Sequence, residues 1–337
     1  MMDIDAGQIL SEPVVAAGSD LARLVAFDPN HVIDKDVRFA LRRAATVSAL
    51  LITQEQALNA VENKYRGDFL RDVLSGRAKN PEHSKEYALG LGWQLDMPCI
   101  VVSAQLDPQS ASEQPAPTRV LRSWQARFHL AWTQVVARES KSFPCADFSD
   151  EVVAVFSLPD ADLRDPGAIA RKLQAKVERV VNGVAGDRGG GRRMFSVGTS
   201  RLVTRFEELP TAYQQAQRAT EVGRRFSGGN NISHFDDLGI HRLIGLIPDH
   251  KELSAFARDM LGELADDSVN ATDMRATLQV LLDHNLNVAE ASRELMMHYN
   301  TMRYRISKLE KIVGPFTTDA NLRLNVAVAL QVLKIQN

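Results

Sequence analysis

The chain has 337 residues, of which 45% are hydrophobic and 24% charged, and its formal net charge at pH 7 is -2. These ordinary globular values exclude a wholly disordered, fibrous or membrane-embedded chain, and the length predicts two or three domains because one core usually stops growing near roughly 250–300 residues. A near-neutral chain has little general attraction to phosphate, so any nucleic-acid contact has to come from a local cationic patch.

Cysteine usage and the N-terminus bear on where the protein works. Cys99 and Cys145 are too few for a disulfide framework and lie in apolar, strand-like segments. The N-terminus lacks the basic start of a signal peptide, and charged and polar residues interrupt the apolar stretch 41–58. We therefore expect a cytoplasmic protein with no membrane partner.

Residues 1–80 predict a helical N-terminal segment. The first thirty residues contain several glycines and prolines and predict a loop or the remnant of a larger unit. Apolar positions at helical spacing then predict an amphipathic helix over 34–58, with an extension toward Tyr65 left open. The apolar positions of this helix are Val37, Leu41, Ala44, Ala45, Ser48, Leu51 and Ile52. A short helix over 67–74 is expected to end at Gly76, which favours a left-handed cap.

Residues 81–245 predict a mixed α/β sheet domain, because strands and helices alternate there. The strands are predicted at 99–106, 151–158, 194–198 and 231–235, and the helices at 82–91, 120–138, 169–181 and 209–226. No strand pattern returns after residue 237, which predicts an all-helical C-terminal domain over 246–337. The expected fold class is α+β and multidomain.

A helix-turn-helix is predicted at 275–313. One helix ends at His284 and Asn285, and a second begins at Asn287, an N-cap residue followed three positions later by Glu290 in a capping-box pattern. After the turn 296–298, a third helix runs from Tyr299 to Val313. Its apolar stripe consists of Met302, Ile306, Leu309 and Val313.

The opposite face of this third helix has the chemistry of a DNA-reading surface. Arginine reads guanine and asparagine reads adenine through paired hydrogen bonds in the major groove. The residues predicted to contact bases are Asn300, Arg303, Tyr304 and Ser307. The residues predicted to contact phosphate are His298, Tyr299, Thr301, Arg305, Lys308 and Lys311. The alternative is a merely solvated helix face, and His298 on its own is more typical of a simple hydrogen-bonding turn residue.

This region resembles the C-terminal helix-turn-helix of PucR/CdaR-type regulators. The resemblance rests on the runs that begin at Asn287 and at His298, the latter reading H-Y-N-T-M-R-Y-R-I, and on the closing segment around Asp319. Upstream, segments around 64–76, 195–219 and 232–238 are similar to the central GGDEF-like domain of that family. Tyr299 occupies a position that is often basic in the family. From the resemblance, we expect the sensor domain of many relatives to be absent here or reduced to residues 1–60.

The resemblance implies a transcription regulator that binds double-stranded DNA and responds to a small-molecule effector. A homodimer on a palindromic operator is expected, because one recognition helix contacts too few base pairs for specific binding. The alternative function is a signalling or scaffold protein whose middle domain binds a nucleotide or metabolite and whose helical end binds protein.

A GGDEF-like domain also raises the hypothesis of cyclic-dinucleotide synthesis, which the residues do not favour. Phe148 and Ser149 stand where the signature turn has glycines, although Asp150 and Glu151 of that turn survive. Gln105 stands where a metal-binding carboxylate is expected, although Asp107 remains. The glycine-rich stretch 186–193 precedes a strand and lacks the Gly-Lys-Ser/Thr of a phosphate loop, which favours a connector. We expect no enzyme activity, no cofactor and no metal site.

Overall fold

A computed structural model describes residues 2–4, 7–16, 19–29, 33–78, 80–110, 113–159, 162–186, 193–247 and 250–336. The chain divides into two compact units, Met1–Val73 and Leu74–Asn337, each of which is described by itself. The domain boundaries predicted at residues 80 and 245 stay predictions. Within the described ranges, no helix is long and apolar enough to cross a membrane.

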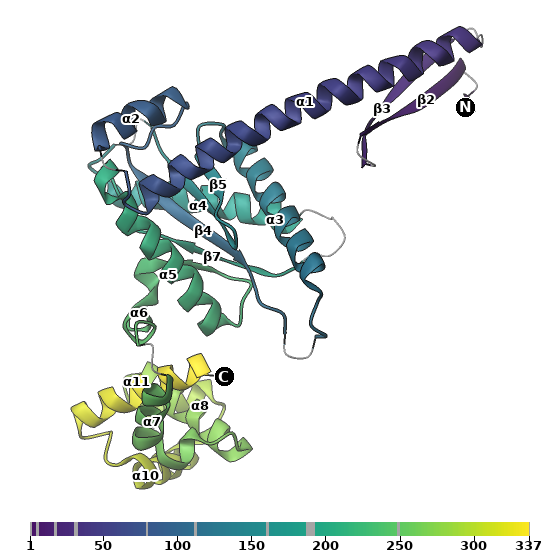
Figure 1. The fold of residues 1–337 in the computed structure, drawn as a ribbon. Helices are drawn as coiled ribbons and strands as arrows, with labels where there is room; N and C mark the ends of the chain where they lie inside the picture. The colour runs from purple at the N-terminus through teal and green to yellow at the C-terminus, as the bar shows by residue number, and fades with distance from the viewer. Residues whose placement is uncertain are drawn as a thin grey trace. The chain divides into compact units, whose positions relative to one another are not determined.

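The first unit is an antiparallel sheet against a long helix (Figure 1). Its strands are β1 (Met2–Ile4), β2 (Gly7–Ala16) and β3 (Ser19–Asp28), in the order β1-β2-β3. The loop predicted for the first thirty residues is therefore wrong. Along β2, buried Leu10 and Val14 alternate with more exposed residues, as expected for a strand with one covered and one exposed face. Pro13 lies opposite Arg23 and is accommodated in the antiparallel pairing.

Helix α1 (Lys35–Leu74) is continuous over 40 residues. The two helices predicted at 34–58 and 67–74 thus merge, because no proline intervenes and Gly67 inside a helix costs only about 1 kcal/mol relative to alanine. Gly76, two residues after the helix ends, has a φ of 71° and confirms the predicted left-handed cap.

The α/β part of the second unit is built on the five-stranded sheet β5-β6-β4-β7-β8. The strands are β4 (Cys99–Leu106), β5 (Cys145–Asp147), β6 (Glu151–Ser157), β7 (Phe195–Thr199) and β8 (Ile232–His234). Strand β4 pairs antiparallel with β6 and β7, whereas β7 and β8 are parallel. The four strands predicted from the sequence are confirmed, and β5 adds an edge strand at the strand-like segment around Cys145.

Helices cover both faces of this sheet (Figure 1). Helices α3 (Thr118–Glu139) and α4 (Pro166–Gly186) pack on one face through a core that includes Trp132, Phe156 and Leu173. Helix α5 (Leu209–Ser227) lies against β4 and β7 on the other face. The approach is so close that a Cβ at Gly198 would stand 2.2 Å from the backbone oxygen of Ala216.

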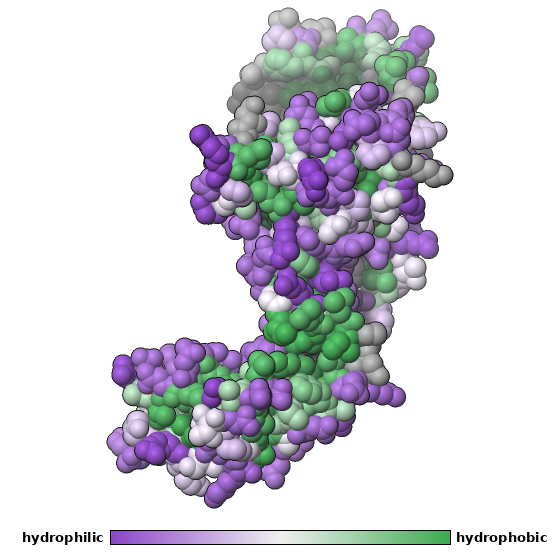
Figure 2. All heavy atoms as spheres, turned by 90° about the vertical axis from the view of Figure 1, so that its left-hand side faces the viewer, coloured by the Kyte–Doolittle hydropathy of each residue, from purple (hydrophilic) through white to green (hydrophobic). Residues whose placement is uncertain are grey.

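Four shorter elements complete the α/β part. They are helix α2 (Pro81–Gly90), the turns η1 (Phe206–Glu208) and η2 (Phe235–Leu238), and helix α6 (His241–Ile244). Apolar side chains gather on the surface over α6 (Figure 2), where Ile240, Leu243, Leu246 and Ile247 are all exposed. Residues 187–192 of the glycine-rich stretch lie outside the described residues.

The all-helical C-terminal part predicted from residue 246 is confirmed. It contains α7 (His250–Leu261), η3 (Gly262–Ala265), α8 (Val269–Asp283), α9 (Val288–Glu294), α10 (Tyr299–Val313) and α11 (Ala320–Gln336). One apolar core joins these elements, and its fully buried members include Leu261, Leu278, Met302, Leu309 and Phe316.

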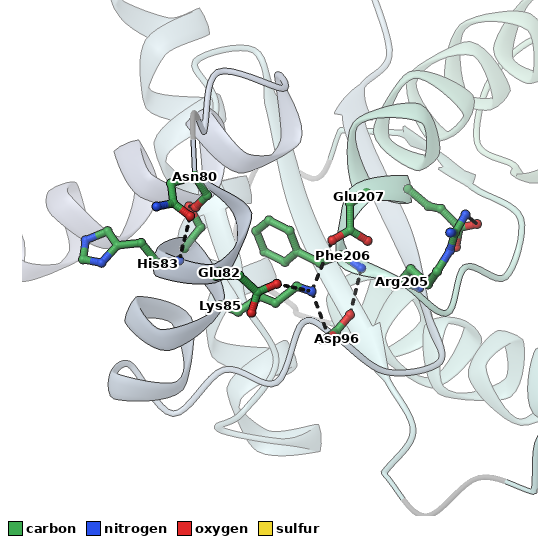
Figure 3. A network of polar contacts seen from close by, with 10 residues as sticks. Asn80, Glu82, His83, Lys85, Asp96, Arg205, Phe206 and Glu207 are labelled. Carbon is green, nitrogen blue, oxygen red and sulfur yellow. Dashed lines mark hydrogen bonds and ion pairs between the residues drawn. The ribbon is translucent and has the colours of Figure 1, made fainter.

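Lys85 on α2 joins three separate segments of the α/β part (Figure 3). Its Nζ lies 3.2 Å from Glu207 in η1, 3.2 Å from Glu82 and 3.3 Å from Asp96. The hydrogen bond to Glu207, together with those to Glu82 and Asp96, raises the pKa of Lys85 above its ordinary value. Asp96 also accepts a hydrogen bond from the backbone N–H of Phe206 at 3.1 Å, so the network fixes α2 to the start of α5.

Replacing Lys85 with methionine is expected to lower the thermal unfolding temperature, because three carboxylates then share one site without a cation. The measurement is a melting curve at low and high salt, and the deficit should shrink at high salt as repulsion among the acids is screened. The matched control is Lys172→Met, at an exposed lysine of α4. Equal melting temperatures for both variants would contradict this role.

Candidate nucleic-acid interface

The connection between α8 and α9 has the backbone conformation that the sequence predicted. Asn285 has a φ of 51° and takes the left-handed position after α8, followed by Leu286 at 67°. Asn287 is the N-cap of α9, with its side-chain oxygen accepting hydrogen bonds from the backbone N–H groups of Ala289 and Glu290. The start of α9 is therefore fixed by local hydrogen bonds.

Glu290 was expected to complete a capping box and instead points to a histidine. Its carboxylate lies 3.5 Å from Nδ1 of His284, and Nε2 of the same ring lies 2.5 Å from Glu294. The hydrogen bond to Glu294 is the main cause of a raised pKa at His284, and Glu290 adds to it. His284 thus ties the end of α8 to both ends of α9.

The tight turn between α9 and α10 sets the direction of the third helix. Met296 has a φ of 50°, and the backbone N–H of Met297 donates to the oxygen of Ser292 at 2.8 Å. His298 is the N-cap of α10, where its Nδ1 accepts a hydrogen bond from the backbone N–H of Asn300 at 3.3 Å. His298 thus acts as a hydrogen-bonding turn residue, the alternative raised for it from the sequence.

Helix α10 is seated on the apolar stripe that was predicted. Met302, Leu309 and Val313 are buried and Ile306 is half-buried in the core of the helical part. Helices α8 and α9 both contact α10. The remaining face of α10 is held outward, because rotation of the helix would expose this stripe.

Four predicted base-contacting residues share the outward face. Asn300, Arg303, Tyr304 and Ser307 are all exposed, and the side chain of Tyr304 is 71% exposed. Together with exposed Lys311 they span roughly 100° of arc at 100° per residue. The structure therefore brings a guanidinium, an amide and two hydroxyls onto one solvent-facing surface, which we call the outward face of α10.

The other predicted phosphate contacts lie around this face. Tyr299 and Thr301 are exposed in the first turn of α10, and Lys308 is half-buried at its flank. Arg293, in the last turn of α9, is exposed as well and was not predicted. Its signal in the sequence was a cation just before the tight turn 296–298.

Arg305 differs from its prediction as a phosphate contact. Its guanidinium lies 2.7 Å from the carboxylate of Asp273 and donates to Thr277 Oγ1 at 2.7 Å, with both partners on α8. The side chain is only 22% exposed. Arg305 therefore holds α10 against α8. Spacing alone could not reveal this, because the acceptors lie 28 and 32 positions earlier.

Glu151, an acidic residue of the signature turn, is engaged by neighbouring side chains. Glu151 is buried at the start of β6 and accepts hydrogen bonds from Ser103 at 2.5 Å, from Gln217 at 2.9 Å and from the hydroxyl of Tyr213. Phe148, which replaces a glycine of the signature turn, packs edge-on against Tyr213 with ring centroids 5.8 Å apart. Side chains thus fill the space beside Glu151.

Gln105 at the end of β4 and Asp107 just after it are also hydrogen-bonded to neighbouring residues. Asp107 accepts hydrogen bonds from Ser196 at 2.6 Å and from the backbone N–H of Asn230 at 2.7 Å, and Gln105 accepts one from Arg224 at 3.2 Å. Among the described residues, no group of three or more His, Cys, Asp or Glu side chains is placed to hold a metal ion.

Burial raises the pKa of the Cys99 thiol to about 12, so this group stays protonated at neutral pH.

Fold and site together define a helix-turn-helix attached to an α/β domain. Residues 274–332 match the PucR C-terminal helix-turn-helix domain, and residues 75–222 match the GGDEF-like domain. The chain thus matches both domains that the resemblance to PucR/CdaR-type transcriptional regulators implied, which confirms that resemblance.

Two curated relatives match most of the chain. The purine catabolism regulatory protein of Bacillus subtilis is 20% identical over 90% of this chain and 55% of its own length. The carbohydrate diacid regulator of Escherichia coli is 20% identical over 81% of this chain and 67% of its own length. This chain therefore spans only about half the length of the first of these relatives. A solved regulator of polyketide synthase expression from Bifidobacterium adolescentis is 16% identical, with a TM-score of 0.36 over 82% of this chain and 99% of that one.

The His284 contacts predict a pH-dependent stability of the helical part. Because the pKa of His284 is raised in the folded state, its contribution is complete below the ordinary value of 6.5 and is lost as the pH rises through the raised value. Glu294→Gln should therefore lower the melting temperature most below pH 6.5 and little at pH 9, as measured by melting curves across this range. Glu263→Gln, at an exposed acid of η3, is the control and should show no such pH profile.

Arg305→Met is expected to destabilise the folded chain by about 1–2 kcal/mol, because it breaks a charge-assisted pair and a hydrogen bond between α8 and α10. Chemical unfolding measures this loss. Arg303→Met, an equivalent change on the exposed side of the same helix, should leave stability within about 0.5 kcal/mol. A similar loss of stability for both variants would contradict the contact assigned between Arg305 and α8.

Proposed function

We propose that this chain is a sequence-specific transcription regulator that reads a palindromic operator as a homodimer in the cytoplasm. The observation that carries the proposal is the outward face of α10, where Asn300, Arg303, Tyr304 and Ser307 are exposed while the opposite stripe is buried. A helix presented in this way after a tight turn fits the major groove. The helix-turn-helix match favours this function over that of a signalling or scaffold protein.

Roles follow from the chemistry of each exposed group. Arg303 suits the two acceptors of guanine, and Asn300 suits the acceptor and donor of adenine. Tyr304 and Ser307 contact neighbouring base edges, and phosphates are bound by Tyr299, Thr301, Lys308 and Lys311. Arg305 is left out of this set because its guanidinium is bound to Asp273 and Thr277.

We further propose that the GGDEF-like domain is not a cyclase and that a small molecule modulates DNA binding. Support for the first point is that Glu151 and Asp107 are engaged by neighbouring side-chain and backbone groups and that Phe148 fills the signature turn. Support for the second is that the relatives are named for purine catabolism, for a carbohydrate diacid and, in a proline-responsive activator of Bacillus subtilis, for proline. Operator affinity measured with and without each of these compound classes tests the effector.

The operator itself tests the main proposal. DNA sequences selected from a random pool by the purified full chain should converge on two related half-sites about one helical turn, roughly 10 base pairs, apart. Arg303→Ala should then weaken binding by about 1–3 kcal/mol and relax the preference at one base position in each half-site. Lys308→Ala should weaken binding to every sequence alike and reduce the salt dependence of the affinity.

Arg305→Met is the matched control for this experiment, because it removes a cation of the same helix that faces α8. At a temperature where the variant is folded, it should keep the base preference of the wild type. Selection that yields no consensus, or equal sequence-independent losses for Arg303→Ala and Lys308→Ala, would contradict the proposal.

A further inference from the structure

Helix α1 has two apolar faces, of which only one is covered within its unit. Ala45 and Ala49 are buried under the β2-β3 hairpin next to Val14, with Ile52 packed against them. Val47, Leu50 and Leu51 are 57%, 68% and 59% exposed. At 100° per residue the centres of the two faces lie roughly 170° apart, so the hairpin leaves the second face uncovered.

The exposed face has the spacing of a coiled-coil seam. From Val37 to Gln54, side chains that are all apolar except Gln54 recur alternately three and four residues apart, and Tyr65 lies eleven residues further on in the same repeat. We call this set the heptad seam: Val37, Ala40, Ala44, Val47, Leu51, Gln54 and Tyr65. The printed sequence carries the same spacing through Leu58 and Val61. The amphipathic stripe predicted for 34–58 thus mixes two faces, because Val37, Ala44 and Leu51 belong to the seam and the others lie toward the hairpin.

A repeat of seven residues indicates what kind of surface covers the seam. The apolar positions repeat every 3.5 residues on average, slightly less than the 3.6 residues of one helical turn. Such a stripe stays in contact along its whole length only with another helix that winds around it. From Val37 to Tyr65 the seam spans about four heptads, roughly 43 Å of helix, which is the length over which coiled coils become stable. Isolated apolar side chains on a surface do not show this periodicity.

We propose that two copies of this chain pair through the heptad seam of α1 as a parallel, in-register coiled coil. This inference deepens the homodimer of the proposed function by assigning its interface. A second copy supplies the same repeat in the same register, and a two-fold axis makes the pairing self-complementary and closed. The hairpin stays on the outer side of each helix, where it already covers Ala45 and Ala49.

The charges beside the seam are compatible with the parallel direction. Arg43 and Lys64 occupy the flanking position g, and Glu55 and Glu62 occupy the flanking position e. In a parallel, in-register pair each g residue faces the e residue five positions later in the other copy, so these four charges lie opposite uncharged residues and no two like charges meet. Gln54, as a polar residue within the seam, favours one register.

The oligomeric state of the full chain tests this interface without DNA. The wild type should sediment as a dimer, and the double variant Val47→Glu with Leu51→Glu should raise the dimer dissociation constant by at least about a hundredfold, because four charges would be buried in an apolar seam. The matched control is Phe39→Glu, at a residue of α1 that is 64% exposed and lies outside the seam. This control should keep the wild-type mass.

Cysteine pairing tests direction and register, and it does not depend on a variant that could unfold. Val47→Cys and Leu51→Cys should each form a disulfide-linked dimer under mild oxidation, because in a parallel pair every seam residue faces its own copy. Phe39→Cys should form none. An antiparallel pair allows at most one of the two seam positions to cross-link.

Three results would overturn the proposal: a monomeric wild type, a double variant of dimer mass, or seam cysteines that do not cross-link. Because no DNA is present in these measurements, failure of the interface is separate from failure of operator recognition. A chain that binds a palindrome but dimerises elsewhere would keep its consensus in the double variant.

Discussion

The outward face of α10 depends on one packing constraint, which is the burial of Met302, Leu309 and Val313 on the same helix. These side chains are inserted into the core shared with α8, α9 and α11, and their burial decides which way the rest of α10 points. Local capping by Asn287 and His298 sets where the helices begin. Arg305 then adds a polar contact that resists sliding of α10 along α8. These contacts fix the position and orientation of α10, and none of them involves a side chain of its outward face.

Local patterns in the sequence were sufficient for most of the second unit. Continuous apolar runs identified β4 and β6, and the 3.6-residue period with caps located α8, α9 and α10 to within a few residues, because these signals arise within one element. The hairpin of the first unit was not predicted, because its glycine and proline residues indicated a loop more strongly than the short alternation of apolar and polar residues indicated strands. Arg305 and Glu290 were misassigned because their partners lie on other elements, and spacing along one helix carries no information about those.

The α/β part shows how a sheet can keep acidic residues without an obvious use for their charge. Glu151 satisfies its carboxylate with three neutral donors, and Asp107 does so with a hydroxyl and a backbone N–H. These bonds join β4, β6, α5 and the segment before β8, so the acids act as cross-links between layers. Removing the carboxylate of Glu151 would leave the donors Ser103, Gln217 and Tyr213 without this acceptor, which is costly where the groups are shielded from water.

The apolar side chains around α6 affect how the protein can be divided for study. Ile240, Leu243, Leu246 and Ile247 are exposed within eight consecutive residues that lead to α7. A fragment ending at Ile247 would carry all four at a frayed terminus and be prone to aggregate, whereas one ending at Gly239 would lack them. The chain should therefore be divided before Ile240 when its parts are studied separately. The solubility of the fragment that contains the helical part should then be measured without detergent.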